Sequence, residues 1–253
     1  MKNVHLQICD EPESLSRSAA EHLVHVAGEA VSQRGRFLVV LAGGNTPRRL
    51  YRLLTTGPFL ERVPWQVTHW FWGDERCVPP DDPESNYGQA RALLFEHAPA
   101  PETNIHRIRG ELDPQQAAAD YAQALRRFAD PGLLWPRFDL VLLGLGADGH
   151  TASLFPGSPP DPGPDTATLV VTAAYAGRPT QRITLTPRVF NDARHVLFLV
   201  SGAEKAEALA ATLEGPHDPV RRPAQRIHPS HGRVTYLVDR AAAALLKQHG
   251  EER

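Results

Sequence analysis

The sequence predicts an α/β fold of three layers, in which a Rossmann-like, mainly parallel sheet has helices on both faces. Two observations predict this class. Short β-type segments alternate with longer segments of helical periodicity, and the segment 37–42 is continuously apolar, as expected of a strand covered on both faces. We expect a single domain over residues 1–253, because a chain of 253 residues fits one large domain and shows no internal repeat.

The first half of the chain is expected to begin with a strand over residues 4–9 and a helix over residues 14–33. The helix is indicated by apolar residues that recur with a period of about 3.6 residues, and Gly35 fits its end. The apolar segment 37–42 is the next strand. The other elements expected here are a helix over 46–55, a strand over 67–72, and helices over 85–97 and 114–128.

The second half is expected to contain an apolar strand over residues 138–143 and a short β segment over 182–186. A short helix over 187–192, a strand over 195–201 and a helix over 203–213 come next. The chain is expected to finish with a strand over 234–238 and a closing helix over 239–248, which Asp239 would cap. The segments 157–165 and 215–223 contain several prolines and are expected to be exposed loops.

Composition and charge exclude several classes of protein. The formal net charge is −2, so the basic charge of a nucleic-acid-binding protein is absent. The apolar segments fall far short of the roughly 18 residues that a membrane helix needs. The N-terminal residues lack the apolar stretch of a signal peptide, and we expect a cytoplasmic protein. Cys9 and Cys77 are expected to be buried thiols, and the 12 scattered histidines predict no metal site.

The first segment with chemical potential follows the strand over 37–42. Gly43 and Gly44 allow backbone N–H groups to turn towards an anion, and Asn45 and Thr46 lead into the N-terminus of a helix. Thr46 is expected to cap this helix, with Pro47 as its first residue. The segment fits a phosphate-binding turn and equally an ordinary strand-to-helix turn. It lacks the Gly-Lys-Ser/Thr ending of a Walker A loop.

The second segment comes directly after the strand over 67–72. Asp74, Glu75 and Arg76 form there either an ion-paired surface turn or the rim of a site. In the second case Arg76 would bind an anion or a developing oxyanion. Ser85, further along, is explained by its fitness as a helix cap.

The third segment follows the strand over 138–143. His150 lies after a Gly-rich loop, with Asp148 two residues before it. Histidine titrates near neutral pH and is the commonest general base. A histidine on a strand-end loop fits that role about as well as it fits a structural one.

The same segment matches two known motifs only in part. Gly144, Gly146 and Gly149 fit the pattern G-x-G-x-x-G, but a dinucleotide site also needs a helix and an acid about 20 residues further on. The acids downstream, Asp161 and Asp165, lie in a Pro-rich loop instead. A serine-hydrolase elbow is absent, so hydrolysis of an ester here would use water rather than a serine nucleophile.

Two further basic residues are candidates for binding an anion. Arg182 opens the β segment over 182–186, and Lys205 lies in the first turn of the helix over 203–213. A cation at a helix N-terminus opposes the helix dipole, and a bound anion would remove that conflict. The alternative is a solvated lysine.

Together these segments resemble the family of glucosamine-6-phosphate isomerases and 6-phosphogluconolactonases, on its lactonase branch. The matching stretches are AGGNTP at 42–47, GDERCVPPDDPESNY at 73–87, GLGADGHTASLFPG at 144–157, RITLT at 182–186, SGAEKAEAL at 201–209 and PAQRI at 223–227. Asn45 stands where this family usually has Ser, and Tyr236 where Trp is common. The stretch DGHTASLFPG lacks the carboxylate of the deaminase segment DGHIAFNEP, which favours lactone hydrolysis over isomerisation with loss of ammonia.

The resemblance implies hydrolysis of 6-phospho-D-glucono-1,5-lactone to 6-phosphogluconate, the second step of the oxidative pentose phosphate pathway. No metal or organic cofactor is expected. The expected partner is the small sugar-phosphate substrate, with no nucleic acid and no membrane, and the protein is expected to be a monomer or a small homo-oligomer.

A mechanism hypothesis for this hydrolysis gives each candidate residue an expected role. His150 would deprotonate the attacking water and return the proton to the leaving ring oxygen. Arg76 would steady the oxyanion, or orient the water together with Asp74. Asp148 would orient His150 or bind a sugar hydroxyl. The residues expected to bind the phosphate are Gly43, Gly44, Asn45, Thr46, Arg182 and Lys205.

Two other functions are open at this point. One is an amino-sugar phosphate isomerase or deaminase on the same fold. The other is a non-catalytic sensor of sugar phosphates; such sensors usually carry a DNA-binding segment, for which 253 residues leave no room beside this fold.

Overall fold

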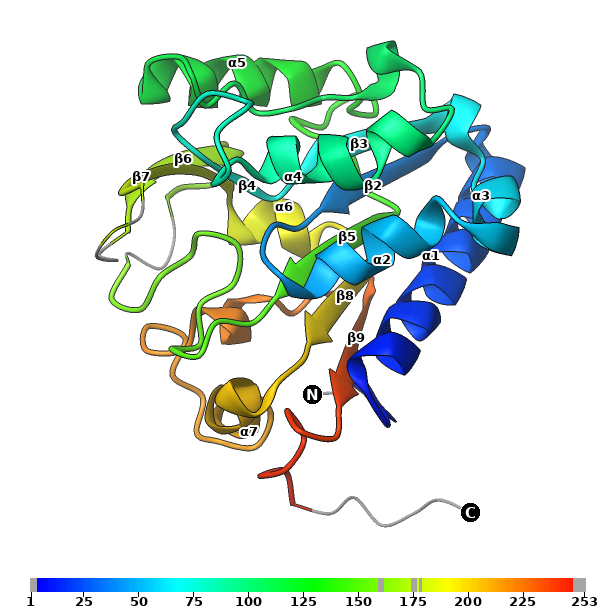
Figure 1. Cartoon of the computed structure of the whole chain (residues 1–253). Helices are drawn as coiled ribbons and strands as arrows, with labels where there is room; N and C mark the ends of the chain where they lie inside the picture. The colour runs from blue at the N-terminus through cyan, green and yellow to red at the C-terminus, as the bar shows by residue number, and fades with distance from the viewer. Residues whose placement is uncertain (1–3, 159–161, 174–176, 178, 248–253) are drawn as a thin grey trace.

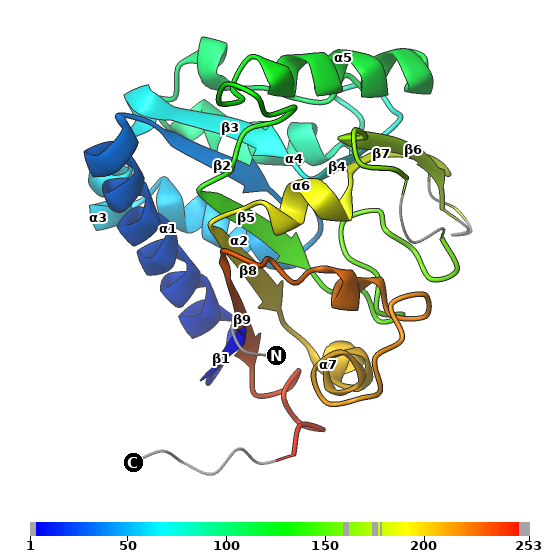
Figure 2. The same cartoon turned by 180° about the vertical axis from the view of Figure 1, so that it is seen from behind.

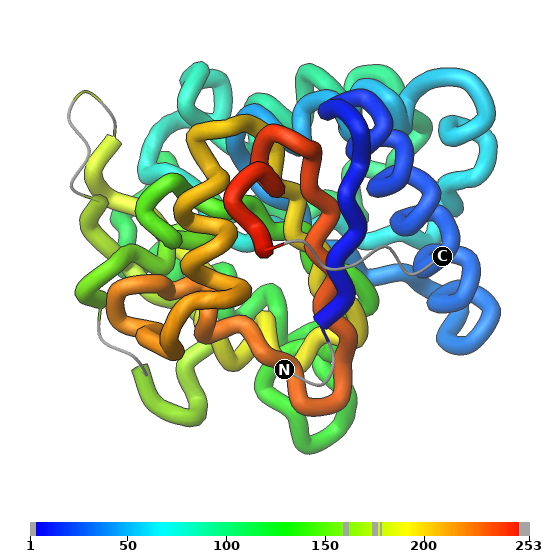
Figure 3. The backbone as a smooth tube through the Cα atoms, turned by 90° about the horizontal axis from the view of Figure 1, so that it is seen from below, coloured from blue at the N-terminus to red at the C-terminus, as the bar shows by residue number. Residues whose placement is uncertain are grey.

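The computed structural model describes residues 4–158, 162–173, 177 and 179–247. Within them, six parallel strands form a central sheet in the order β1-β9-β8-β5-β2-β3 (Figure 1). These strands are β1 Val4–Cys9, β2 Phe37–Leu41, β3 Thr68–Trp72, β5 Leu140–Gly144, β8 His195–Val200 and β9 Arg233–Asp239. Figure 3 shows β1 beside β9, so the first and last strands of the described chain are neighbours.

Helices lie on both faces of this sheet, which confirms the three-layer α/β class. One face carries α1 (Pro12–Arg34), α2 (Thr46–Leu54) and α4 (Asn86–Leu93), and the other carries α6 (Pro187–Asn191) (Figures 1 and 2). The other α-helices described are α3 Gly57–Arg62, α5 Pro114–Arg126 and α7 Ala206–Leu213. Short 3-10 helices span Trp65–Val67, Phe95–His97, Glu102–Asn104, Ala203–Lys205 and Pro223–Arg226.

A second, antiparallel sheet begins where β3 ends. In the described chain its order is β4-β7-β6, with the bounds Asp74–Arg76, Gln181–Leu185 and Thr168–Thr172. Only Gly73 separates β3 from β4, so the chain passes directly from one sheet into the other. The strands β4 and β6 were not predicted from the sequence. β4 consists of three charged residues and β6 is a short, half-buried segment, so neither shows a clear strand pattern.

The core lies between the sheet and its helices. All five residues of β2 are buried, as the continuous apolar segment predicts for a central parallel strand. α1 buries one stripe of small and aliphatic side chains, among them Leu15, Ala19 and Leu23. Gly35 ends this helix with φ 71°, a left-handed conformation that glycine adopts without steric cost.

Most of the expected elements are confirmed, with small shifts at their ends. The helix expected over 85–97 is α4 capped by Ser85, whose Oγ accepts the N–H of Gly88, followed by a separate 3-10 turn. Thr46 is the first residue of α2 rather than its cap; Asn45 precedes it and makes no side-chain capping bond. The sequence analysis did not predict α3.

The closing helix expected over 239–248 is wrong. Asp239 ends β9, residues 240–245 form turns, and Gln248 lies outside the described residues. Asp161 also lies outside them. The Asp239 carboxylate does accept the N–H of Ala242, as a capping residue would. Ala242 is buried and Leu246 packs against the core, but Leu245 is 55% exposed, and this limited packing does not hold so short a segment in a helix.

Candidate active site

The loops at the carboxyl ends of the central strands enclose a cavity of about 710 Å³. β8, β5, β2 and β3 are consecutive neighbours in one parallel sheet, so the segments that follow them meet at the same edge. Every residue that the sequence predicts for the site lines this cavity: Gly43, Gly44, Asn45, Thr46, Asp74, Arg76, Asp148, His150, Arg182 and Lys205.

The turn after β2 depends on its glycines. A Cβ on Gly43 would lie 1.9 Å from Oδ1 of Asn86, so a side chain there would displace the amide that donates to Asp74. Gly44 has φ 89°, which glycine adopts readily. The buried Tyr51 hydroxyl donates to the main-chain oxygen of Ala42 at 2.6 Å and holds the start of the turn against α2. The N-terminal residues of α2 therefore face the cavity at close range, where backbone N–H groups can bind an anion.

Asp74 is buried at the junction of the two sheets and held by neutral donors. Ser153 donates its hydroxyl to Oδ2 of Asp74 at 2.6 Å. Nδ2 of Asn86 donates to the main-chain oxygen of Asp74 at 2.9 Å and reaches Oδ1 at 3.4 Å. The orientation of this carboxylate is thus set before any ligand arrives. Sequence reasoning missed both partners, because they lie 12 and 79 residues away along the chain.

Glu75 points away from the cavity and ties β4 to α4. Its carboxylate accepts the backbone N–H groups of Arg76, Asn86 and Tyr87 at 2.7–2.8 Å, and the Ser85 hydroxyl at 3.1 Å. Burial raises the pKa of this carboxyl to about 7, although the three N–H donors favour its charged form. Glu75 therefore positions both Arg76 and Asn86, a role that the sequence analysis did not assign.

His150 and Asp148 form a dyad on the loop after β5. Nδ1 of His150 lies 2.5 Å from Oδ1 of Asp148, and the same oxygen accepts the backbone N–H of His150 at 3.1 Å. An imidazole whose Nδ1–H donates to a carboxylate presents Nε2 as its basic nitrogen. Gly146 makes room for the dyad, because a Cβ there would lie 2.0 Å from Nδ1 of His150.

The glycines of this loop do not form a dinucleotide site. No helix follows β5 within residues 145–158; the chain runs through turns and an isolated bridge between Thr151 and Leu154. The missing helix agrees with the sequence argument that Gly144, Gly146 and Gly149 are not part of a dinucleotide-binding motif.

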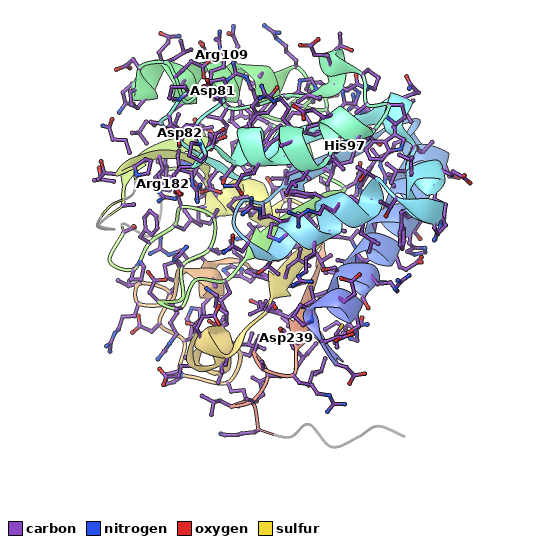
Figure 4. The ribbon with its side chains drawn as sticks, in the orientation of Figure 1. Asp81, Asp82, His97, Arg109, Arg182 and Asp239 are labelled. Atoms are coloured by element: carbon purple, nitrogen blue, oxygen red, sulfur yellow. The ribbon has the colours of Figure 1, made fainter. Side chains whose placement is uncertain are left out.

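Arg76 and Arg182 face each other across the small sheet. They are register partners in the antiparallel pair β4–β7, so their side chains leave the same face, and both are buried (Arg182 is labelled in Figure 4). Arg76 donates to the main-chain oxygen of Glu84, whose carboxylate lies 3.7 Å from Nη1 of Arg76. The Arg182 guanidinium lies over the Phe155 ring at 5.9 Å. Two guanidinium groups at directly opposite positions repel each other, and an anion in the cavity reduces that repulsion.

Lys205 reaches the cavity from the 3-10 turn Ala203–Lys205, immediately before α7. The preceding residues Ser201 and Gly202 also line the cavity. Other lining residues were given no role from the sequence. Glu84, Asn86, Ser201, Gly202 and Glu204 lie within the stretches that match the family, whereas Pro12, Ser16, Arg49 and Gln89 lie outside them.

The described residues contain no group of three or more His, Cys, Asp or Glu side chains that could hold a metal ion. None of the described helices is both long and apolar enough to span a membrane. The thiol of Cys9 is buried, as expected, whereas that of Cys77 is only half-buried.

The chain is similar to known proteins over almost its whole length. The family model described as "Glucosamine-6-phosphate isomerases/6-phosphogluconolactonase" matches residues 10–236. A 6-phosphogluconolactonase of Mycobacterium tuberculosis is 39% identical over 251 residues, which cover 95% of this chain and 98% of the relative.

Two solved structures show the same fold. The crystal structure of a protein called devB superposes with a TM-score of 0.87 and 37% identity, over 96% of this chain and 100% of that one. A monomeric glucosamine-6-phosphate deaminase superposes with a TM-score of 0.82 and 26% identity, over 95% of this chain and 99% of that one. The likeness therefore includes both reaction types named in the family's description.

Proposed function

The chain belongs to the family of glucosamine-6-phosphate isomerases and 6-phosphogluconolactonases, and we propose that it hydrolyses 6-phospho-D-glucono-1,5-lactone to 6-phospho-D-gluconate. This is the second step of the oxidative pentose phosphate pathway. The observation that supports it best is one cavity that holds both a His150–Asp148 dyad and a set of anion-binding groups. The proposed enzyme acts in the cytoplasm, as a monomer or a small homo-oligomer, on a small substrate and without a cofactor.

The phosphate of the substrate binds to the groups that favour an anion. The backbone N–H groups of residues 43–46 supply partial positive charge at the start of α2, and Lys205 and Arg182 supply full charges. Binding at this remote group holds the lactone ring over the dyad. Phosphate binding thereby places C1 of the lactone next to the dyad before water attacks, which lowers the entropic cost of the reaction.

His150 acts as the general base. Its Nε2 takes a proton from a water molecule while the water oxygen bonds to C1 of the lactone, and the carbonyl oxygen becomes an oxyanion. When the tetrahedral intermediate collapses, the bond between C1 and the ring oxygen breaks and Nε2 returns the proton to that oxygen. Asp148 holds the Nδ1–H of the ring throughout and stabilises the imidazolium that forms between the two steps.

Arg76 and Asp74 complete the chemistry. The guanidinium of Arg76 stabilises the oxyanion on C1, since charge develops there only in the transition state. Asp74, which Ser153 and Asn86 hold in place, orients the attacking water together with Arg76. A lactone is an activated ester, so a base and an oxyanion partner suffice and no serine nucleophile is needed.

The proposed function is tested with fresh 6-phosphogluconolactone, made in situ and followed through a coupled 6-phosphogluconate dehydrogenase. The spontaneous rate of hydrolysis is subtracted, because the lactone opens unaided. We expect turnover well above that rate, and a much lower kcat/KM for glucono-1,5-lactone, which lacks the phosphate. Folded protein without excess turnover would overturn the proposal. Release of ammonia from glucosamine 6-phosphate in that case would assign the deaminase reaction instead.

A further inference from the structure

A buried carboxylate lies just outside the cavity, at the end of β9. Asp239 is 2% exposed and does not line the cavity (Figure 4). It accepts the Ser201 hydroxyl at 2.6 Å, the backbone N–H of Gly202 at 3.1 Å and the backbone N–H of Ala242 at 2.7 Å. Three donors from two segments thus converge on one carboxylate. No lysine or arginine of the described residues pairs with it.

Its partners form the loop that presents Lys205 to the cavity. Ser201 and Gly202 follow β8, and the backbone N–H of Lys205 donates to the main-chain oxygen of Gly202 at 3.1 Å. Gly202 has φ 104°, a backbone conformation that L side chains rarely adopt, so the loop depends on a glycine at this position. Such a loop stays in place only where its surroundings hold it.

We propose that Asp239 is a positioning residue for phosphate binding, because it fixes the 201–205 loop and thereby the place of Lys205 in the cavity. The neighbouring strands β8 and β9 pair up to Val200 and Val238, so Asp239 lies where the loop leaves the sheet. An ionised carboxylate has only acceptors, which suits a position where hydroxyl and N–H donors converge. The kinetic part of this proposal rests on the proposed function; the binding part does not.

Asp139 offers a matched control at the opposite end of the sheet. It is also an aspartate, is also 2% exposed and also holds neighbouring segments together. Its carboxylate accepts the backbone N–H of Leu38 at 2.9 Å and pairs with Arg34 at 2.9 Å. It lies outside the cavity and has no contact with the 201–205 loop. A general effect of losing a buried aspartate, such as lowered stability, should appear in Asp139→Ala as well.

The experiment compares the parent protein with Asp239→Ala, Asp239→Asn and Asp139→Ala. Binding of 6-phosphogluconate is measured by calorimetry, with gluconate as the probe that lacks phosphate, and KM and kcat are measured with the lactone. We expect Asp239→Ala to weaken 6-phosphogluconate binding and to raise KM, each about tenfold, with kcat within a factor of about three. Asp239→Asn keeps one acceptor oxygen and should recover part of this loss. Asp139→Ala should bind as the parent does.

Each outcome decides the proposal. Parent-like binding and KM in folded Asp239→Ala, or an equal loss in Asp139→Ala, would assign Asp239 a structural role only. If Asp239→Ala does not fold, Asp239→Asn decides by the same criteria. If the parent binds 6-phosphogluconate but does not turn over the lactone, the proposed function fails while the binding comparison still tests Asp239. A parent that does not bind 6-phosphogluconate would overturn both.

Discussion

The two edges of the central sheet handle buried carboxylates in opposite ways. At the amino edge, Asp139 pairs with Arg34 and Arg194, at 2.9 Å and 3.4 Å. At the carboxyl edge, Asp74 and Asp239 are held by hydroxyl, amide and backbone N–H groups, and no cation of the described chain pairs with either. Arginines therefore neutralise the buried Asp139 at the amino edge, whereas neutral donors satisfy the buried Asp74 and Asp239 at the carboxyl edge.

This difference explains how one sheet provides both stability and a site. Because arginines already neutralise the carboxylate at the amino edge, this edge does not need a charged ligand for its stability. At the carboxyl edge, no carboxylate of the described chain pairs with Lys205, and Arg76 reaches the Glu84 carboxylate only at 3.7 Å. Positive charges that the carboxylates of the protein do not neutralise attract the phosphate of an incoming substrate. Substitutions at the amino edge should therefore lower stability, whereas those at the carboxyl edge should weaken substrate binding or catalysis.

The largest effect on catalysis, apart from loss of His150 itself, is expected from Gly146→Ala. The new Cβ would lie 2.0 Å from Nδ1 of His150 and 2.6 Å from Oδ1 of Asp148, so it forces the dyad apart. We expect kcat to fall by about 10²-fold or more, because the general base is displaced. The fold should survive, since the clash is with two movable side chains. Gly28→Ala, where nothing lies within 4 Å, is the control and should keep the parent's kcat.

Lys205→Ala should act on substrate binding rather than on the chemical step. A charged hydrogen bond to phosphate is worth about 1.5–3 kcal/mol, so KM should rise about 10-fold to 100-fold with a much smaller change in kcat. Steady-state kinetics measure both constants. Lys247→Ala is the matched control, because this exposed lysine does not line the cavity. An unchanged KM in Lys205→Ala would remove this residue from the phosphate site.

At the amino edge, Asp139→Ala should lower stability and leave catalysis alone. The substitution removes the acceptor of Leu38 N–H and leaves Arg34 and Arg194 without their carboxylate. We expect the free energy of unfolding to fall by about 3 kcal/mol, measured by urea denaturation, with kcat/KM near that of the parent. A loss of kcat/KM at unchanged stability would contradict the division between the two edges.

The amino edge should also be the more sensitive to acid. Burial, helped by the charges of His195, His25 and His5 and opposed by that of Glu29, lowers the pKa of His22 to about 4. Between pH 6.5 and about 4 the unfolded chain therefore binds a proton that folded His22 does not. Its contribution to stability, on the order of 2 kcal/mol, is complete above pH 6.5 and is lost as the pH falls towards 4.

The variant His22→Asn isolates this contribution. The parent should lose more stability than His22→Asn between pH 7 and pH 4.5, as urea midpoints at the two pH values will show. His97→Asn, at an exposed histidine (Figure 4), is the control and should follow the parent. Equal losses in the parent and in His22→Asn would show that His22 is protonated alike in both states.

The sequence alone could predict the central sheet and the loops of the cavity, because both have local signals. Apolar segments identify β2 and β5, and the glycines and polar residues after them identify strand ends. It could not predict the groups that hold the candidate residues in place. Ser153 and Asp239 reach their partners across 79 and 38 residues, and no short pattern records such contacts. The prediction of the closing helix was wrong for the related reason that helix propensity alone does not decide the structure of a short segment.

The measurement that tests the proposed mechanism most directly is kcat/KM of His150→Ala beside the parent, with spontaneous hydrolysis subtracted. His150 is partly exposed and lies on a loop, so the variant should keep the parent's circular dichroism spectrum and urea midpoint. The proposed mechanism predicts a fall in kcat/KM of about 10²-fold to 10⁴-fold. A value within a few-fold of the parent's, from equally folded protein, would contradict it and move the general base to another group of the cavity.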